Sequence, residues 1–172
     1  LCGWVDDPKA VEMVMAQQAY PLFGPACAAT GTPGSGRGKK KFLGGPLAEL
    51  CGGKYPTKHQ GTKDCTSNGA GGAVDVLKAG AVKRGLITWN GETATEAIHG
   101  FARHEIMKDY FGRSPGGTSG ASAGHACQKY GTLLRKQYDK YDLRKYSPGL
   151  ADRWGDVGQG VPDELEKAAK EN

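Results

Sequence analysis

The sequence predicts a mainly helical protein with few short strands. Apolar side chains recur at helical spacing in several segments, whereas β-branched runs that favour strands are almost absent. Glycine is abundant, with 28 among 172 residues, but no Gly-X-Y repeat occurs, and no apolar run reaches the ~18 residues of a membrane helix. We therefore expect a soluble chain without membrane contact, in which residues 1–172 form one domain or half of a larger one.

The first two predicted helices are short and are separated by a flexible loop. Asp7 before Pro8 is typical of a helix start and predicts a helix over residues 8–19. The glycine-rich, basic stretch 31–41 has no apolar periodicity, so we expect a flexible surface loop there. Residues 46–50 then add one helical turn before the Gly52-Gly53 break.

A long central helix is predicted over residues 65–84. Its apolar residues recur at i, i+3, i+4, i+7 and i+11 and predict one buried face. Most residues of its first turns are small, which allows another backbone to approach closely and indicates tight packing. The predicted buried face consists of Ala70, Ala73, Val74, Leu77 and Ala81.

Further helices are predicted over residues 93–108, from about Ser119, and after Pro162. The first carries Ala94, Ile98, Phe101, Ala102 and Glu105 on one side, and the second carries Ala123, Ala126, Cys127 and Tyr130. Short strands are expected around Ile87 and Leu133. The tyrosine-rich region between residues 138 and 146 is expected to be polar and irregular.

Cysteine usage and charge limit the compartment and the cofactors. The five cysteines are odd in number and widely spaced, and no C-x-x-C occurs, so neither a disulfide framework nor a zinc site is expected. The first residues, LCGWVDDPKA, lack the charged and apolar regions of a signal peptide. We expect no metal and no cofactor, and either a reducing compartment or one that is reached without a signal peptide, rather than classical secretion.

The net charge of +5 favours contact with anionic partners without naming one. Basic runs at 39–41 and 135–145, the second containing Tyr138 and Tyr141, could contact nucleic acid through phosphates and base stacking. A solvated basic surface is the simpler interpretation. The 31–41 stretch does not match a phosphate-binding G-x-x-x-x-G-K-[ST] loop.

The segment HQGTKDCTSNGAGGAVDVL, residues 59–77, suggests nucleophilic chemistry. Cys65 begins the long helix, where backbone N–H groups and the helix dipole favour a thiolate. The Gln60 amide and the Cys65 backbone N–H could both donate to an oxyanion formed at the sulfur. The alternative is a half-buried structural cysteine after an ordinary loop.

This segment resembles the nucleophile motif of papain-like cysteine peptidases, Q-G-x-C-G-S-C-W. A second similarity is the Gly116-Gly117 turn, followed by a helix and the Lys129-Tyr130-Gly131 exit into a strand, so the likeness covers residues 55–135. The resemblance implies a peptide or protein substrate, Cys65 as nucleophile, Gln60 as oxyanion donor and Gly116 and Gly117 as substrate-binding residues. It also implies that this chain is the helical half of a papain-like α+β fold, with the β-rich half absent.

The sequence departs from the family pattern at several positions. Gln60 and Cys65 are five residues apart instead of six, Asp64 places a carboxylate beside the thiol, and Thr66 replaces the aromatic residue. The family's base histidine follows the cysteine by ~130–150 residues. Only 172 − 65 = 107 residues follow here, so the base is expected outside this chain. The alternative is that His59, six residues before Cys65, approaches the thiol across the loop and substitutes for this base. We expect the four histidines, His59, His99, His104 and His125, to be solvated or locally hydrogen-bonded.

These observations support two hypotheses of function. In the first, the chain is a peptidase-type protein that is incomplete as a catalyst. In the second, it is a non-catalytic structural or binding component of a larger assembly, with neighbouring chains as partners. The segments CGWVDDPKAV, TEAIHGFARHEI and GVPDELE are similar to papain-like proteins of phages and bacteria, which implies a phage particle as such an assembly.

Overall fold

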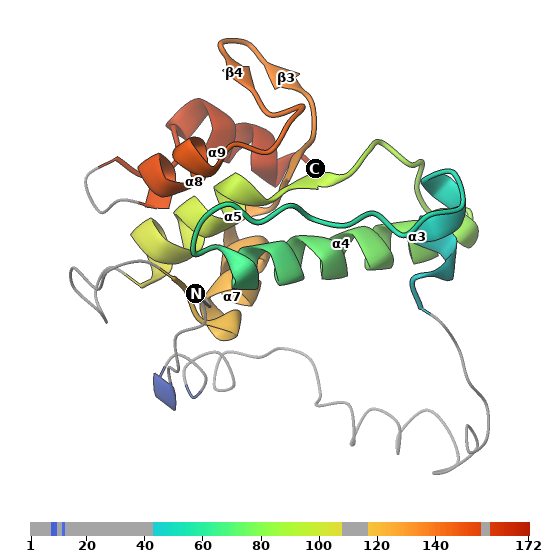
Figure 1. Ribbon diagram of the computed structural model, residues 1–172, viewed down its shortest axis with the longest axis horizontal. Coiled ribbons are helices and arrows are strands. Elements are labelled where there is room, and N and C mark those ends of the chain that lie inside the picture. Colours follow the sequence, from blue (N-terminus) through green and yellow to red (C-terminus); the bar gives the residue numbers. More distant parts are fainter. Residues whose placement is uncertain (1–7, 10–11, 13–42, 108–116, 156–158) are drawn as a thin grey trace.

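The structure, a computed structural model, describes residues 8–9, 12, 43–107, 117–155 and 159–172. It is mainly helical, as predicted (Figure 1). The remainder of the predicted helix 8–19, the 31–41 loop, Gly116, Cys2 and Cys27 lie outside the described residues. The described elements are α3 (Gly45–Leu50), α4 (Cys65–Lys83), β1 (Thr93–Ala94), α5 (Thr95–Gly100), the π-helix η1 (Phe101–Ile106), α7 (Gly120–Tyr130), β2 (Leu133–Leu134), β3 (Gln137–Tyr138), β4 (Tyr141–Asp142), α8 (Pro148–Gly155) and α9 (Asp163–Lys170).

Helix α4 lies at the centre of the arrangement, with α5 and α7 packed against it and α3 against its far end (Figure 1). Its start at Cys65 and the positive-φ glycines Gly52 and Gly53 after α3 confirm the predictions for these segments. None of the described helices has the length and apolar character needed to cross a bilayer.

The prediction of the buried face of α4 is wrong except at Ala70, which packs against the core. Beyond its first turn, where Ser67 is buried, the buried side of α4 consists of Gly71, Asp75 and Ala79. Leu77, in contrast, is 72% exposed. The reason is the close approach of α5: a Cβ added to Gly71 would lie 2.7 Å from Thr95 Cγ2. Small residues therefore face α5, and the larger apolar side chains point outward.

The predicted helix 93–108 is divided into β1, α5 and η1. Ile98, Phe101 and Ala102 are buried as predicted, and Phe101 stacks on Tyr130 with ring centroids 4.8 Å apart. His99 is buried, with 2% of its surface exposed and its Nδ1 without a partner among the described residues, so the expectation of a solvated or bonded side chain is wrong there.

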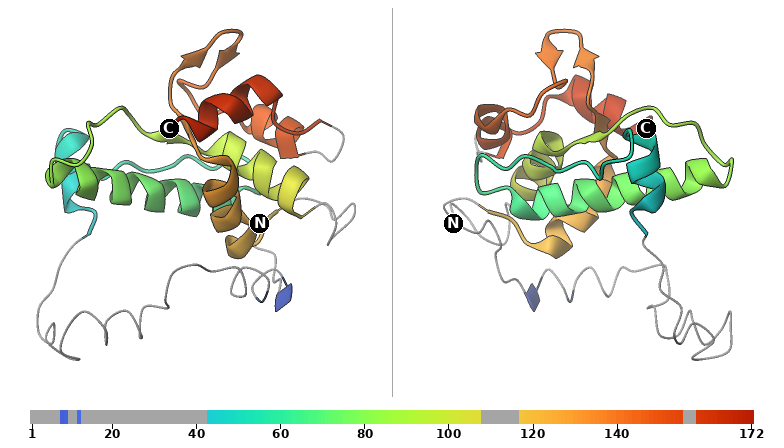
Figure 2. Two further views of the ribbon diagram at one scale, coloured as in Figure 1. Left: turned by 180° about the vertical axis from the view of Figure 1, so that it is seen from behind. Right: turned by 45° about the vertical axis from the view of Figure 1, so that its right-hand side comes forward.

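The strands differ in part from the prediction. The strand at Leu133 is confirmed as β2, which pairs antiparallel with β1 through Thr93 and Leu134. The segment around Ile87 is instead an exposed turn after α4. The region expected to be irregular contains the hairpin β3–β4, whose turn places Asp139 at φ 44°, and the hairpin projects from the helices (Figures 1 and 2).

Helix α9 packs on the end of α7, whereas α8 packs on α5 and η1. Ser119 caps α7, as its side chain accepts a hydrogen bond from the Ser122 amide at 3.0 Å. Gly131 ends α7 at φ 76°, and any Cβ there would collide with the Ala169 carbonyl of α9. Helix α9 begins after Pro162, as predicted, whereas α8 was not predicted from the sequence.

Candidate functional site

Cys65 is the first residue of α4 and is half-buried. Asp64, directly before it, is fully buried, but its carboxylate does not cap the helix. Instead the carboxylate accepts hydrogen bonds from Asn68 Nδ2 at 3.1 Å and from the Tyr146 hydroxyl at 2.8 Å. The residue next to the thiol is therefore held by a side chain 82 residues further along the chain.

The turn before Cys65 is fastened to the start of α8. The Gly61 amide donates to the Tyr146 hydroxyl at 3.1 Å, and the Thr62 hydroxyl bonds the Asp152 carboxylate. Gly61 also packs on Pro148, and a Cβ added to Gly61 would lie 3.0 Å from the Pro148 Cβ. Hydrogen bonds and close packing thus position the turn on residues 146–152.

The electrostatics keep Tyr146 a neutral hydroxyl. Burial raises its pKa well above the ordinary range, and the charges of Asp64 and Glu96 raise it further. Burial likewise raises the pKa of Asp64, although the hydrogen bond from Tyr146 opposes that shift. The hydroxyl can therefore donate to Asp64 while it accepts from Gly61.

A buried ion pair supports Tyr146 from α5. Glu96 is fully buried, and its Oε1 accepts from Arg135 Nη1 at 2.7 Å and from the Ser147 amide at 2.9 Å. The Arg135 guanidinium lies 5.9 Å from the centroid of the Tyr146 ring. Glu96 Oε2 has no hydrogen-bond partner within the described part of the chain.

The predicted oxyanion donor, Gln60, lies on this same turn. Its side chain is exposed, and Nε2 donates to the Thr62 carbonyl at 3.1 Å. A side-chain rotation is therefore needed before this amide can donate to a ligand at Cys65.

The predicted glycine turn lies against the first turn of α4. Gly117 is buried at φ 79°, and its carbonyl accepts from Arg103 Nη1 at 3.2 Å. The next residue, Thr118, shares a hydroxyl–hydroxyl hydrogen bond with Thr66, which follows Cys65. The structure therefore brings two of the predicted site segments together.

The histidines occupy different parts of the fold. His59 is exposed on the Cys65 turn and meets the Tyr146 ring edge-on, with centroids 5.6 Å apart. Burial lowers the pKa of His99 to about 4, and its ring contacts Gly155 of α8. His104 is paired with Glu105, and His125 lies in α7 with a buried Nδ1. Only His59 lies on the loop that leads to Cys65.

The other described cysteines have weakly acidic thiols. Burial raises the pKa of Cys127 to about 11. Burial also raises that of Cys51, with a smaller contribution from Glu92 and Asp75. Neither thiol forms a disulfide with a described cysteine. Both are useful references for the reactivity of Cys65.

Sequence reasoning missed a buried polar cluster beside the turn. Lys58 forms an ion pair with Asp75, which is fully buried and also accepts from the Thr93 amide at 2.9 Å and the Thr93 hydroxyl at 2.6 Å. The cluster ties the segment before the turn to α4 and β1. An aspartate at i+4 from Gly71 was the available signal, because the two share a helix face.

Sequence reasoning also missed Tyr146, because nothing local distinguishes it from Tyr138 and Tyr141. An apolar groove of about 560 Å³ runs along the outer side of α4 and was not predicted either; it is lined by residues that include Leu43, Tyr55, Ala73, Val76 and Leu77. Within the described residues, no group of three or more histidine, cysteine, aspartate or glutamate side chains could hold a metal ion.

Comparisons of the chain with models of known protein families, with curated proteins and with solved structures find no match. Function is therefore inferred from the residues of this chain and from the geometry around Cys65.

Proposed function

We propose that this chain is a papain-like cysteine peptidase-type protein with Cys65 as its nucleophile. One observation carries the proposal: Cys65 begins the central helix, and the first turn of that helix is hydrogen-bonded to the turn that contains Gly117. The motif that resembles the peptidase nucleophile and the glycine turn that resembles the family's substrate-binding turn are thereby neighbours. The two segments are about 50 residues apart in the sequence, so the sequence alone does not predict that they are in contact.

In the proposed reaction, the Cys65 thiolate attacks a peptide carbonyl carbon and the carbonyl oxygen takes up the negative charge. The Cys65 amide donates to this oxyanion, and the Gln60 amide does so after it leaves the Thr62 carbonyl. The resemblance assigns Gly116 and Gly117 to the path of the substrate backbone.

A base must remove the thiol proton, and the leaving amine must receive a proton. The ring of His59, on the described turn, meets the Tyr146 ring edge-on, and the ring of His99 is buried against Gly155 of α8. We propose that the base is supplied from outside this chain, so the chain alone is incomplete as a catalyst.

The proposal is tested by alkylation of each cysteine with iodoacetamide, followed by peptide mass mapping. Cys65 is expected to react faster in the folded protein than in the same chain unfolded in urea at pH 7, because a helix N-terminus favours the thiolate. Cys127 is the internal control: with a pKa of about 11, it should react more slowly when folded than when unfolded.

A Cys65 that reacts more slowly in the folded protein than in urea would contradict the proposal. The variant Asp64→Asn separates the effect of the helix from that of the neighbouring carboxylate. Removal of a negative charge beside the thiol should increase the rate at Cys65 and leave Cys127 unchanged.

A second function, a binding component of a larger assembly such as a phage particle, is favoured by the groove along α4. Its exposed apolar side chains, Leu43, Tyr55 and Leu77, lie on the central helix or beside it. Light scattering tests whether copies of this chain assemble: a mass above 18.1 kDa that Leu77→Lys restores to the monomer value supports it. A wild-type monomer at about 100 μM would contradict self-assembly through this groove.

A further inference from the structure

A second cavity lies on the opposite face of α8 from the Cys65 turn. Helix α8 presents Pro148 and Asp152 to that turn, whereas Leu150, Arg153 and Trp154 line the cavity. At 3.6 residues per turn, these two groups occupy opposite faces of the helix. The cavity is therefore separate from the proposed nucleophile, and a ligand bound in it would not require Cys65 to be catalytic.

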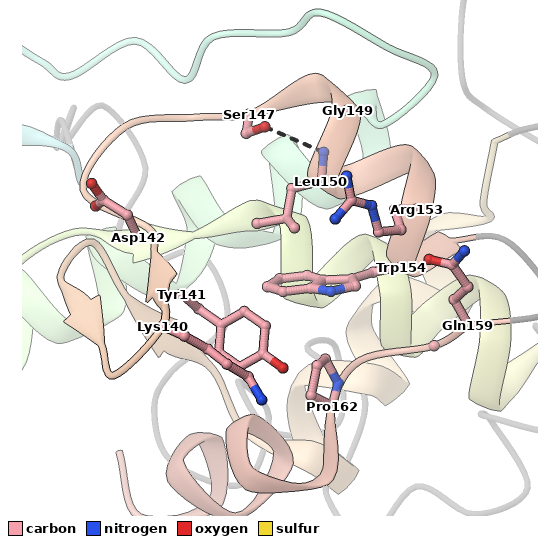
Figure 3. Close-up of a pocket in the computed structure, with 11 residues that line it drawn as sticks. Lys140, Tyr141, Asp142, Ser147, Gly149, Leu150, Arg153, Trp154, Gln159 and Pro162 are labelled. Carbon is pink, nitrogen blue, oxygen red and sulfur yellow. Dashed lines mark hydrogen bonds between the residues drawn. The ribbon is translucent and has the colours of Figure 1, made fainter.

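The cavity has the size of a ligand site and a mixed lining. Its volume is about 680 Å³, within the range of small-molecule pockets. Figure 3 shows Leu150 and Arg153 on one side of the Trp154 ring and Tyr141 and Pro162 on the other, with Gln159 at the edge. The Tyr141 and Trp154 rings meet edge-on, with centroids 6.2 Å apart. Apolar surface and polar groups thus face the same space.

Of the charged side chains that line the cavity, Arg153 is the one without an ionic partner among the described residues. Lys140 pairs with Glu164 at 3.1 Å, and Asp142 accepts two bonds from the Arg144 side chain. Arg153 forms no hydrogen bond or ion pair with any residue that the structure describes, and its guanidinium is directed over the cavity (Figure 3). A single unpaired guanidinium matches a monoanion, and its planar fork of donors matches a carboxylate.

The Gln159 side chain indicates which second group of the ligand should lie beside the carboxylate. The exposed Gln159 side chain has no hydrogen bond to a described residue, and a primary amide offers both donors and an acceptor. These are the groups that a peptide bond satisfies. Tyr141, Leu150 and Pro162 provide apolar contact for a neighbouring side chain.

We propose that this cavity binds a peptide segment that carries a carboxylate, with the carboxylate on Arg153, a peptide group on Gln159 and an apolar side chain against Tyr141, Leu150 and Pro162. A phosphate-rich ligand fits less well, because several phosphates call for several cations, whereas the other lysine of the lining, Lys140, is already paired with Glu164. The carboxylate can belong to a chain end or to an acidic side chain.

The test is a titration of the full chain followed by NMR of the Gln159 side-chain amide and the Arg153 Nε–H. Three probes are compared: acetyl-Ala-Leu-Ala with a free carboxylate, the same peptide as its amide, and acetyl-Leu-Glu-Ala amide. The uncharged amide should bind weakest. Preference for the first probe assigns the site to a chain end, and preference for the third assigns it to an acidic side chain.

Arg153→Gln should weaken binding of the preferred probe about tenfold or more, because a charge-assisted bond is lost. Arg153→Lys should lie between that variant and the wild type, since it keeps the charge without the fork. Arg84→Gln, an equal change of charge at the exposed end of α4, should have no effect. Since Arg153 is exposed, these variants should melt at the wild-type temperature.

Two results would overturn the proposal. The first is that none of the peptides shifts either NMR signal at millimolar concentration, or that they bind Arg153→Gln as tightly as the wild type. The other is a single-stranded thymidylate octamer that shifts both signals while the carboxylate peptides do not, which would assign the surface to nucleic acid.

Discussion

The two faces of α4 are arranged opposite to those of an ordinary surface helix. Its buried face consists of Ser67, Gly71, Asp75 and Ala79, whereas its exposed face carries Leu77. An amphipathic helix normally buries its large apolar residues. The difference shows that close approach to α5, rather than apolar area, determines which side of α4 faces inward.

The buried face of α4 is stabilised by hydrogen bonds, an ion pair and close packing against α5. The exposed face forms one wall of a groove. Asp75 is held by Lys58 and Thr93, and Gly71 lies against Thr95. Val76 and Leu77 of α4 line the groove together with Leu43 and Tyr55. Substitutions on the two faces should therefore have effects of different size and sign.

The largest effect is expected at Asp75. Asp75→Ala removes the closest partner of the largely buried Lys58 ammonium, which keeps Glu92 at 3.3 Å and the Thr93 carbonyl at 3.0 Å. It also removes two bonds from Thr93, so it should lower the free energy of unfolding by about 3 kcal/mol or more. Urea denaturation measures the loss. The matched control is Glu49→Ala, which breaks the exposed ion pair between Glu49 of α3 and Lys83 of α4. It should lower the free energy of unfolding by about 0–1 kcal/mol. Equal losses would show that the buried pair does not hold the face.

Helix α5 extends the buried polar surface to His99, which gives a pH dependence. Its folded pKa of about 4 lies below the ordinary 6.5, so protonation favours the unfolded chain. Stability should be intact above pH 6.5 and should fall as the pH decreases, with a loss of about 3 kcal/mol at pH 4. The measurement is urea denaturation across this range for wild type and His99→Gln. The variant should lack this part of the loss, and parallel curves would contradict the assignment.

Neighbouring glycines of α4 give a test of opposite signs. Gly71→Ala forces a methyl group into Thr95 and should destabilise the protein by about 1–3 kcal/mol. Gly72→Ala meets nothing within 4 Å and should stabilise it by about 0.5–1 kcal/mol, because alanine favours helix. Thermal melts of the two variants compare the faces directly. The same sign for both would mean that α5 does not approach as described.

The smallest effect is expected on the exposed face. Leu77→Gln removes an apolar side chain that is already 72% exposed, so the free energy of unfolding should change by no more than about 0.5 kcal/mol. A loss of about 2 kcal/mol or more in urea denaturation would place Leu77 in a packed core and would remove the distinction between the faces.

Much of the fold was predictable because its signals are local. The cap at Ser119, the glycines after α3 and Pro162 before α9 determine helix ends through nearby backbone groups. The buried face of α4 was not predictable, because it depends on the distance to α5. Helix α8 was missed because it is short and begins Pro148-Gly149, a pair more typical of a turn.

The candidate site was predictable only in its separate parts. The position of Cys65 at a helix start follows from the sequence pattern around it, and the structure confirms it. The bonds that fix its turn do not, since Asp64 and Tyr146 are 82 residues apart and nothing local couples them. The role of Cys65 stays a prediction.

The fastening of the Cys65 turn has a consequence for the order of folding. Its bonds to Tyr146 and Asp152 close loops of more than 80 residues, which are costly in chain entropy and form late. During synthesis, the turn cannot reach its final geometry until residues 146–152 have left the ribosome. The surroundings of this thiol are therefore completed only after most of the described helices have been made.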